Sequence, residues 1–522
     1  MNMLSRRGFM AGLGLATVVP SLTRAQTQLP APVGAGTGTG IGTGVAEDPT
    51  LPRIDGTIAY TVIDPATGTV LAQHLGDMPF APASTLKTIT ALYALDRLGP
   101  DHRFSTRVIR AGNTLILAGG GDPVLDSDAL ADLAARVAED ELQSGRPAPT
   151  SFMVWGGALP RIEQLDPQQA THLPYNPTVS GMILNFNRVH LGWQRGEKGH
   201  QLSLQARGAR VSPRAYTVAI SAVDRRLPLF SYDGAAKLES WTVARGALGR
   251  SGSRWLPVRR PELYAGDVFQ TLCRAKGLVL PAPGVIEIMP EGEEIARHDS
   301  PPLREIVTGM MEYSTNLTAE VIGLAASGAS DIPTSARAME DWLRGHGVGG
   351  SYAFHDHSGL AAANVMTSAA MAHAIAMLGG AGDLRGTMKQ IPLRDGRGKR
   401  IESPIRVEAK TGTLNFVSNL AGYAQKAAGR SLVFAIFEID PARMEATRGQ
   451  ELPEGVIGWT KRAKAVQQEM IEGWFARGLD IYQVPGLNGL PENAPERALL
   501  QPSEAAPYQI DPKLLPGTGI FR

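Results

Sequence analysis

Two groups of residues show the apolar runs and β-branched content that are typical of strands. Residues 57–64 and 69–73 are separated by the turn-forming sequence Pro-Ala-Thr-Gly, which predicts a hairpin near the start of the chain. Toward the other end, residues 407–414, 417–423 and 431–438 form three such runs with short turns between them. Because short connections favour antiparallel neighbours, we expect these three runs to be consecutive strands of one sheet.

Between these groups, apolar residues recur at the three- and four-residue spacing of helices. Residues 86–98 carry such a stripe, and a Gly-Pro pair ends it. A second stripe over residues 303–310 stops at a polar segment, and a new one begins at Leu317. A last stripe over residues 459–474 predicts a closing helix that packs on the sheet.

Composition places the chain among large folded proteins. Its 522 residues exceed what one compact domain needs, since single cores stop growing near ~250–300 residues. The 51 Lys plus Arg and 50 Asp plus Glu leave a net charge of +1, a balance that argues against a nucleic-acid binder or a polybasic membrane-surface protein. One cysteine, Cys273, excludes an internal disulfide and any zinc site built from several cysteines.

The N-terminal 25 residues are typical of an export signal. Paired arginines, Arg6 and Arg7, precede an apolar run over residues 11–22 that is too short to span a membrane. The sequence Ser-Arg-Arg-Gly-Phe resembles a bacterial twin-arginine signal, and a Sec signal or an uncleaved anchor is the alternative. We therefore expect residues 1–25 to direct export to the periplasm.

Two further segments are expected to lie outside the folded domains. Residues 26–50 read as a Gly-rich linker, because their Gly-Thr repeats follow no predicted strand and so lack the setting of a phosphate-binding loop. Residues 479–522 are rich in proline and carry little periodic pattern, which predicts an irregular C-terminal tail.

The first candidate chemistry is the sequence Ser84-Thr-Leu-Lys87 at the start of the first predicted helix. Side chains three residues apart share one helix face. A serine hydroxyl is a poor nucleophile until a base takes its proton, and a lysine can be that base where burial or a second cation lowers its pKa. Alone the pair is a weak indication, because Ser84 can equally cap the helix.

A second polar pair lies between two helical stripes. Ser314 and Asn316 fall on the predicted turn, where both side chains can face a cleft. Ser314 could relay a proton to a leaving group, and Asn316 could hydrogen-bond a substrate amide. The alternative is that they cap the following helix.

The third candidate is the sequence Lys410-Thr411-Gly412-Thr413, within the strand predicted over residues 407–414. Lys410 and Thr411 would offer an ammonium group and a hydroxyl to a carboxylate. Gly412 has no side chain to keep a substrate from the strand backbone. We expect the N–H of Thr413 to point into the same cleft.

Ser-x-x-Lys, Ser-x-Asn and Lys-Thr-Gly, in this order, resemble the three signatures of penicillin-binding proteins and serine β-lactamases. The resemblance implies an α/β (α+β) fold, in which a transpeptidase domain has an antiparallel sheet with flanking helices. Ser84 and Ser314 are 230 residues apart, however, and a compact β-lactamase needs far less chain there. The excess of about 170 residues predicts an insertion between the first two motifs that is large enough for one or two added domains. The resemblance implies that these are β-rich.

With this insertion, the chain resembles the D-alanyl-D-alanine carboxypeptidase/endopeptidase family of the penicillin-binding protein 4 type, serine peptidase family S13. Residues 119–123 (Gly-Gly-Gly-Asp-Pro), 298–306 and 357–360 (His-Ser-Gly-Leu) also resemble segments of that family, whereas residues 394–400 depart from it. The implied domain order is a catalytic domain in two parts, residues 51–110 and 291–478, around inserted domains at residues 111–290.

The family implies a serine-type D-Ala-D-Ala carboxypeptidase or DD-endopeptidase that cleaves peptidoglycan stem peptides or cross-links and is acylated by β-lactams. It assigns the acylated nucleophile to Ser84 and its base to Lys87, while Ser314 and Asn316 would shuttle a proton and hold the substrate backbone. The substrate's terminal carboxylate would bind Lys410 and Thr411 beside Gly412. Backbone N–H groups of Ser84 and Thr413 would form the oxyanion hole.

Two other functions stay open on these residues. A β-lactamase or esterase on the same fold would need an efficient deacylating water, for which the sequence has no dedicated glutamate motif. A non-catalytic penicillin-binding or cell-wall-binding module would not need the Ser84–Lys87 pair.

We expect no cofactor and no metal. The segment His355-Asp356-His357 has metal-ligand residue types at alternate positions, but no third ligand follows at a recognisable spacing. Asp122 in the Gly-Gly-Gly-Asp-Pro segment is interpreted as a turn former.

Overall fold

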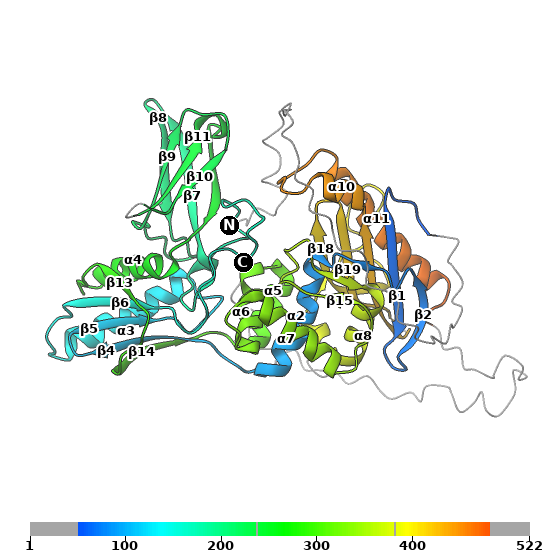
Figure 1. Ribbon diagram of the computed structural model, residues 1–522, viewed down its shortest axis with the longest axis horizontal. Helices are drawn as coiled ribbons and strands as arrows, with labels where there is room; N and C mark the ends of the chain where they lie inside the picture. The colour runs from blue at the N-terminus through cyan, green and yellow to red at the C-terminus, as the bar shows by residue number, and fades with distance from the viewer. Residues whose placement is uncertain (1–50, 236–237, 381–382, 428, 481–522) are drawn as a thin grey trace, which may run out of the picture. The chain divides into compact units, whose positions relative to one another are not determined.

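A computed structural model describes residues 51–235, 238–380, 383–427 and 429–480 of the chain (Figure 1). The predicted export signal and linker lie outside the described residues, as do residues 481–522 of the predicted tail. Within these ranges, no helix is both long enough and apolar enough to cross a bilayer.

A six-stranded antiparallel sheet joins the two ends of the described chain. Its strand order is β17-β18-β19-β20-β1-β2. In that order the strands span Lys389–Gln390, Ile405–Leu414, Val417–Lys426, Ser431–Ile439, Thr57–Asp64 and Thr69–His74. The predicted N-terminal hairpin and the three consecutive C-terminal strands are thus confirmed, and β1 pairs with β20 to unite them.

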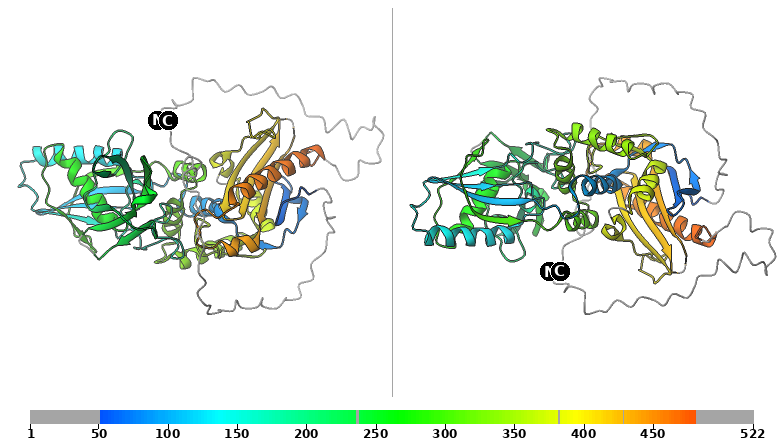
Figure 2. Two further views of the ribbon diagram at one scale, coloured as in Figure 1. Left: turned by 90° about the horizontal axis from the view of Figure 1, so that it is seen from above. Right: turned by 90° about the horizontal axis from the view of Figure 1, so that it is seen from below.

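The 21-residue helix α11, Val456–Ala476, covers one face of this sheet (Figures 1 and 2). Its predicted stripe is confirmed, because Trp459, Ala463, Val466, Met470 and Trp474 are all buried. The Trp474 ring lies 5.6 Å from Tyr60 on β1 and 5.7 Å from Phe434 on β20, centre to centre.

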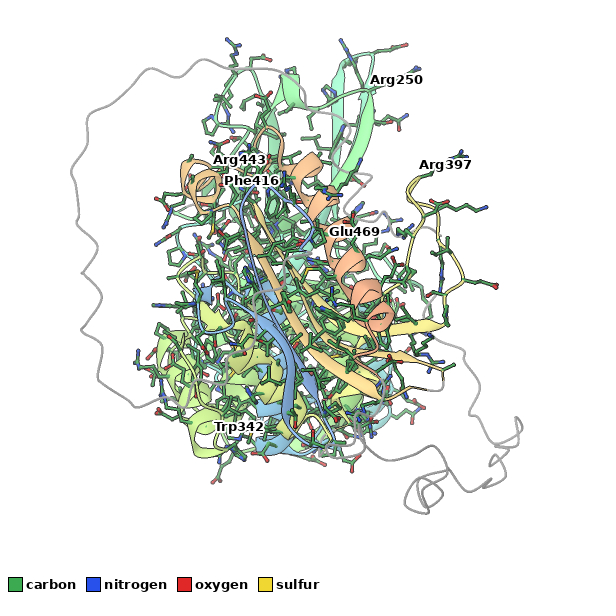
Figure 3. All side chains as sticks on the ribbon, turned by 90° about the vertical axis from the view of Figure 1, so that its right-hand side faces the viewer. Arg250, Trp342, Arg397, Phe416, Arg443 and Glu469 are labelled. Atoms are coloured by element: carbon green, nitrogen blue, oxygen red, sulfur yellow. The ribbon has the colours of Figure 1, made fainter. Side chains whose placement is uncertain are left out.

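The turn between β18 and β19 is tied to the start of α11. Phe416 in this turn meets Trp459 edge-on at 5.9 Å between ring centres. Arg443, from the short helix α10 (Pro441–Ala446), lies over the Phe416 ring, 5.6 Å from its centre (Figure 3). Glu469 lies further along α11 (Figure 3).

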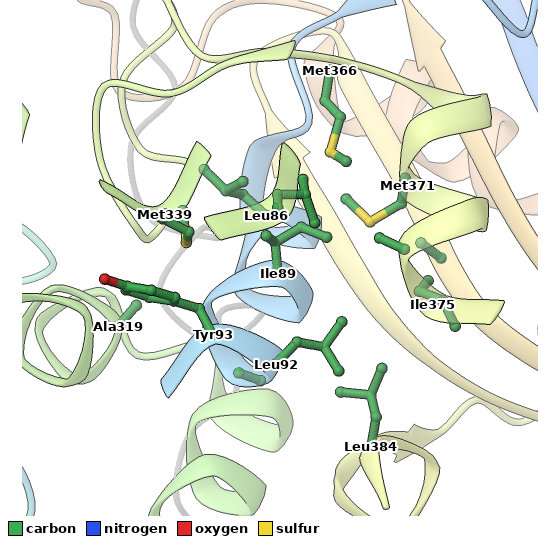
Figure 4. Packing of buried hydrophobic residues seen from close by; sticks show 14 of the residues in the cluster. Leu86, Ile89, Leu92, Tyr93, Ala319, Met339, Met366, Met371, Ile375 and Leu384 are labelled. Carbon is green, nitrogen blue, oxygen red and sulfur yellow. The ribbon is translucent and has the colours of Figure 1, made fainter. Parts of the chain in front are cut away.

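Helices α2 (Lys87–Leu98) and α8 (Ser368–Leu378) belong to the core on the opposite face of the sheet. Leu86, Ile89 and Leu92 pack toward Met371 and Ile375 of α8 (Figure 4). The predicted helix over residues 86–98 is confirmed, with its first turn preceded by the 3-10 helix η1, Ala83–Leu86.

A group of helices continues from α2. These are α5 (Leu303–Tyr313), α6 (Asn316–Ser327), α7 (Ile332–Gly345) and the single turn α9 (Leu384–Thr387). A small antiparallel sheet of β15 (Tyr352–Ala353), β16 (Val365–Thr367) and β3 (Pro79–Phe80) completes this part. The polar interruption predicted between two helices is confirmed, since α5 ends before Ser314 and α6 begins at Asn316.

The chain between α2 and α5 forms a five-stranded mixed sheet with the order β13-β6-β5-β4-β14. These strands span Pro283–Ile286, Ser151–Trp155, Thr114–Ala118, Ser105–Ala111 and Glu293–Asp299. Helices α3 (Ser127–Gln143) and α4 (Pro261–Arg274) share a buried core with it, which includes Cys273. Strands β4 and β14 pair antiparallel, with Ser105 opposite Asp299, so the first and last strands of this region lie side by side.

Two three-stranded sheets complete this β-rich region, in agreement with the fold class expected from the motifs. One contains β7 (Arg188–Gly196), β8 (Gly199–Gln205) and β12 (Ser251–Pro257), and the other β9 (Val218–Val223), β10 (Phe230–Asp233) and β11 (Glu239–Ala244). Short 3-10 helices η2 (Asn185–Asn187) and η3 (Arg245–Ala247) lie in the connections.

Candidate active site

The structure brings Ser84 and Lys87 together at the junction of η1 and α2. The Lys87 ammonium lies 3.1 Å from Ser84 Oγ, and its side chain is completely buried while Ser84 is partly exposed. Lys87 also donates to Asn316 Oδ1 at 2.9 Å and to the carbonyl oxygen of Ser358 at 2.6 Å. Three acceptors on three different segments therefore fix the position of one nitrogen.

A second lysine–serine pair lies on the other side of the site. Lys410, which is 1% exposed, donates to Ser314 Oγ at 3.0 Å and to the carbonyl oxygen of Thr411 at 2.8 Å. Ser314 adopts the left-handed conformation with φ 58°, which ends α5 and turns the chain into α6. This turn sends Ser314 toward Lys410 and Asn316 toward Lys87, so the three motifs meet although they are far apart in sequence.

Exposure divides the predicted residues into two layers. The two lysines are buried, whereas Ser84, Ser314, Asn316, Thr411 and Thr413 are all partly exposed. A molecule approaching from solvent would meet hydroxyl and amide groups first, with two cations directly behind them. Such an arrangement suits a substrate that carries a carboxylate and an acyl group.

Strand β18 lies tightly against η1 at Gly412. A Cβ added to Gly412 would lie 2.8 Å from the Pro82 carbonyl oxygen and 3.0 Å from the Thr85 nitrogen. The sequence predicted that Gly412 lets a substrate approach the strand backbone. The structure shows that the absence of a side chain lets the segment that carries Ser84 pack against the strand. Thr85 stabilises this segment by donating from Oγ1 to the Pro82 carbonyl oxygen at 2.6 Å.

A second glycine, Gly359, contacts the same segment from the other side. It adopts φ +73°, and a Cβ added there would overlap the carbonyl oxygen of Ala83. Ala83 itself has φ 48°, a conformation that costs a non-glycine residue on the order of 1 kcal/mol. The residue before Ser84 is therefore held in a strained backbone geometry by the contacts around it.

Asn419 is a positioning residue that motif reasoning missed. It faces Gly412 across the β18–β19 ladder and is 2% exposed. Its Nδ2 donates to the carbonyl oxygen of Ala81 at 2.8 Å, and its Oδ1 accepts from the N–H of Glu438 at 3.2 Å. An amide within a strand that is mostly apolar was the available signal, but nothing in the sequence identified its partner.

The segment that resembles the family's Ser-Gly-Leu motif lies behind Lys87. Asp356 accepts from the N–H groups of Gly359 and Ala361, both at 2.7 Å, and from Asn364 Nδ2 at 2.9 Å. His357 is completely buried, with Nε2 2.7 Å from Ser335 Oγ, and burial lowers its pKa to about 3. Asp356 and His357 are thus engaged in hydrogen bonds within the protein.

Asp122 is buried in the segment that follows β5. Its Oδ1 accepts from the Val124 N–H at 2.9 Å, as a turn former does, and burial raises its pKa to about 7.

Comparison with known proteins shows the family. The model of the D-Ala-D-Ala carboxypeptidase 3 (S13) family matches residues 43–463. A D-alanyl-D-alanine carboxypeptidase from Actinomadura sp. (strain R39) is 25% identical over 478 residues, which cover 79% of this chain and 85% of that protein. A carboxypeptidase from Mycobacterium tuberculosis is 27% identical over 420 residues, with coverages of 75% and 77%.

Among solved structures, penicillin-binding protein 4 from Haemophilus influenzae is similar in fold. It matches with a TM-score of 0.61 and 18% identity, covering 80% of this chain and 97% of that one.

Proposed function

The chain belongs to the D-Ala-D-Ala carboxypeptidase 3 (S13) family, and from this premise we propose how its residues carry out the reaction. The protein is a serine-type peptidase of the D-Ala-D-Ala carboxypeptidase class. We propose peptidoglycan stem peptides that end in D-Ala-D-Ala, or the cross-links made from them, as its substrates.

In the first step, Lys87 acts in its neutral amine form: Ser84 Oγ attacks the carbonyl carbon of the penultimate D-alanine while its proton passes to the lone pair of Lys87 Nζ. The 3.1 Å between the two atoms is a hydrogen-bond distance, so the proton can move directly. The N–H groups of Ser84 and Thr413 are assigned to the oxyanion, where loss of one such donor costs roughly 3–4 kcal/mol.

Next, the C–N bond breaks and the terminal D-alanine leaves with a proton on its amine. Ser314, held 3.0 Å from Lys410, is the proposed relay for this proton. Lys410 and Thr411 are assigned to the carboxylate of the departing residue, and Asn316 to the backbone of the remaining acyl group. Water then hydrolyses the ester on Ser84 and restores the free enzyme.

The observation that carries this proposal is the contact of Ser84 with a completely buried Lys87. Fluorescent penicillin should label the wild type but not Ser84→Ala, and Ser253→Ala, an exposed serine on β12, should label normally. Release of D-alanine from a pentapeptide, followed in the same preparations, should need Ser84. Labelling of Ser84→Ala would overturn the assignment, and fast label release without D-alanine would favour the β-lactamase alternative.

We also propose that residues 1–25 act as an export signal and that the mature protein works in the periplasm. The paired arginines and the short apolar run support this. Cell fractionation with N-terminal sequencing should find the mature protein in the periplasmic fraction, beginning near Gln26. A full-length chain in the cytoplasm would contradict it.

A further inference from the structure

Glu320 is a buried carboxyl group directly behind the proposed base. It lies on α6, four residues after Asn316, so both side chains are on the same face of the helix. The side chain of Glu320 is completely buried. A carboxyl group is rarely placed in a core unless hydrogen bonds satisfy it, which makes its partners informative.

Both carboxyl oxygens of Glu320 accept hydrogen bonds from the segment that contacts Lys87. Glu320 Oε1 accepts from the Ser358 N–H at 2.9 Å, and Oε2 accepts from the His357 N–H at 3.0 Å. The carbonyl oxygen of the same Ser358 accepts from Lys87 Nζ at 2.6 Å. Glu320 thus binds the N–H group of Ser358, and Lys87 binds the carbonyl oxygen of the same residue.

The charges around Glu320 come from two neighbouring segments. Helix α2 contributes Lys87, and the segment after β15 contributes Asp356 and His357. Asp356 already accepts three hydrogen bonds, and His357 is neutral because of its low pKa. Burial, helped by the charge of Asp356, raises the pKa of Glu320 to about 8, whereas Lys87 favours its ionised form.

We propose that Glu320 is a positioning residue for Lys87: it orients the Ser358 carbonyl that holds the amine, and its charge sets the pH above which Lys87 can accept the Ser84 proton. This rests on the proposed function, in which Lys87 is the base. An ionised Glu320 stabilises the ammonium form of Lys87, so Lys87 loses its proton only at a higher pH. No proton needs to cross Ser358, because the influence is electrostatic and geometric.

The role predicts two separable effects. Because the pKa of Glu320 is about 8, its charge acts above that pH, and the role therefore places the acid limb of the wild-type acylation rate above pH 8. Glu320→Gln removes this charge, so the limb should move to lower pH by about one unit. The plateau rate should also fall, since the amide offers one acceptor where the carboxylate offers two. Glu320→Asp keeps the charge but is shorter by one methylene, so it should lower the plateau and leave the limb in place.

Glu340 provides a matched control on α7. It is also a nearly buried glutamate, and its Oε1 accepts from the Phe354 N–H at 2.5 Å, just before the same segment. Its Oε2 accepts from Arg344 of the same helix at 2.9 Å. Glu340→Gln should therefore disturb the segment without moving the acid limb.

The experiment measures the second-order rate of acylation by a penicillin from pH 5 to 10 for the full chain and the three variants, with thermal unfolding of each. A limb that moves only in Glu320→Gln supports the role. If Glu320→Gln folds and the acid limb of its acylation rate does not move, the role is overturned. An unchanged plateau rate in Glu320→Asp also overturns it, and this result decides the matter if Glu320→Gln does not fold. Absence of acylation in the wild type at every pH would instead overturn the proposed function.

Discussion

Gly412→Ala is the substitution that probes the junction between β18 and η1 most directly. The glycine is not in a left-handed conformation, so alanine can adopt its backbone angles. What alanine adds is one methyl group, placed 2.8 Å from Pro82 O, 3.0 Å from the Thr85 nitrogen and 3.2 Å from Ala83 Cβ. All three atoms belong to the short segment that carries Ser84.

The size of the effect follows from these distances. Restoring the shortest contact to an ordinary 3.4 Å displaces the segment by about 0.6 Å, and since 1 Å of misplacement costs on the order of 100-fold in rate, we expect roughly a tenfold loss. Overpacking of this kind also costs about 1–3 kcal/mol of stability. Lys87 follows Ser84 at the start of α2, so the displacement should separate the Lys87 amine from Asn316 Oδ1 and from the Ser358 carbonyl oxygen.

The assay is the rate of acylation by a penicillin at saturating and sub-saturating concentrations, with Gly349→Ala as control. Gly349 has no heavy atom within 4 Å of an added Cβ and is not left-handed, so its variant should behave as wild type. If Gly412→Ala is acylated within twofold of the wild-type rate, the contact between β18 and η1 does not position the nucleophile.

Four further outcomes are expected. Asn419→Ala leaves the carbonyl oxygen of Ala81 without its donor, so it should cost about 1–3 kcal/mol in denaturant unfolding and slow acylation as well. Burial lowers the pKa of His357 to about 3 from an ordinary 6.5, so between these pH values the unfolded chain binds a proton that the native state does not. The free energy of unfolding should therefore fall as pH falls through this window, by up to about 1.4 kcal/mol per pH unit. His357→Asn should flatten that slope. Burial raises the pKa of the Cys273 thiol, so iodoacetamide should label it in urea and not in the native protein, as mass spectrometry would show. Trp474→Ala removes the largest side chain between α11 and the sheet and should cost roughly 3–5 kcal/mol in the same denaturant unfolding.

Motif order and periodicity predicted the catalytic fold well because they depend on local sequence. The helix that follows Ser84 and the three C-terminal strands each carry their own apolar pattern and their own turns, so their positions could be read directly. The turn at Ser314 was predicted for the same reason, since the stripes on either side of it are interrupted there. The distance between the first two motifs then predicted a long insertion, and the resemblance to the family implied that it is β-rich.

The supporting residues could not be predicted in this way, because their meaning lies in distant partners. Asn419 contacts Ala81 across 338 residues, and Lys87 contacts the Ser358 carbonyl across 271. Glu320 contacts its partners across 37 and 38 residues, within a helix whose pattern alone suggests only packing. A buried polar residue in an apolar run is a visible signal, but only the fold identifies the group that it satisfies.

The inner architecture of the insertion was also beyond the sequence. Its strands are short, and β5 pairs in parallel with β6, while β6 pairs in parallel with β13 after a long intervening stretch of chain. Such pairings depend on crossovers that carry no local signature. The strained φ of Ala83 is likewise a product of the segments packed around it.

The account depends most on Ser84 as the acylated nucleophile. Trypsin should release residues 54–87 as one peptide, because Lys87 is the first lysine or arginine after Arg53. After reaction with benzylpenicillin, peptide mass spectrometry should find the penicilloyl adduct on this peptide at Ser84, and no adduct in Ser84→Ala. An adduct on another serine, or one that persists in the Ser84→Ala protein, would contradict the account.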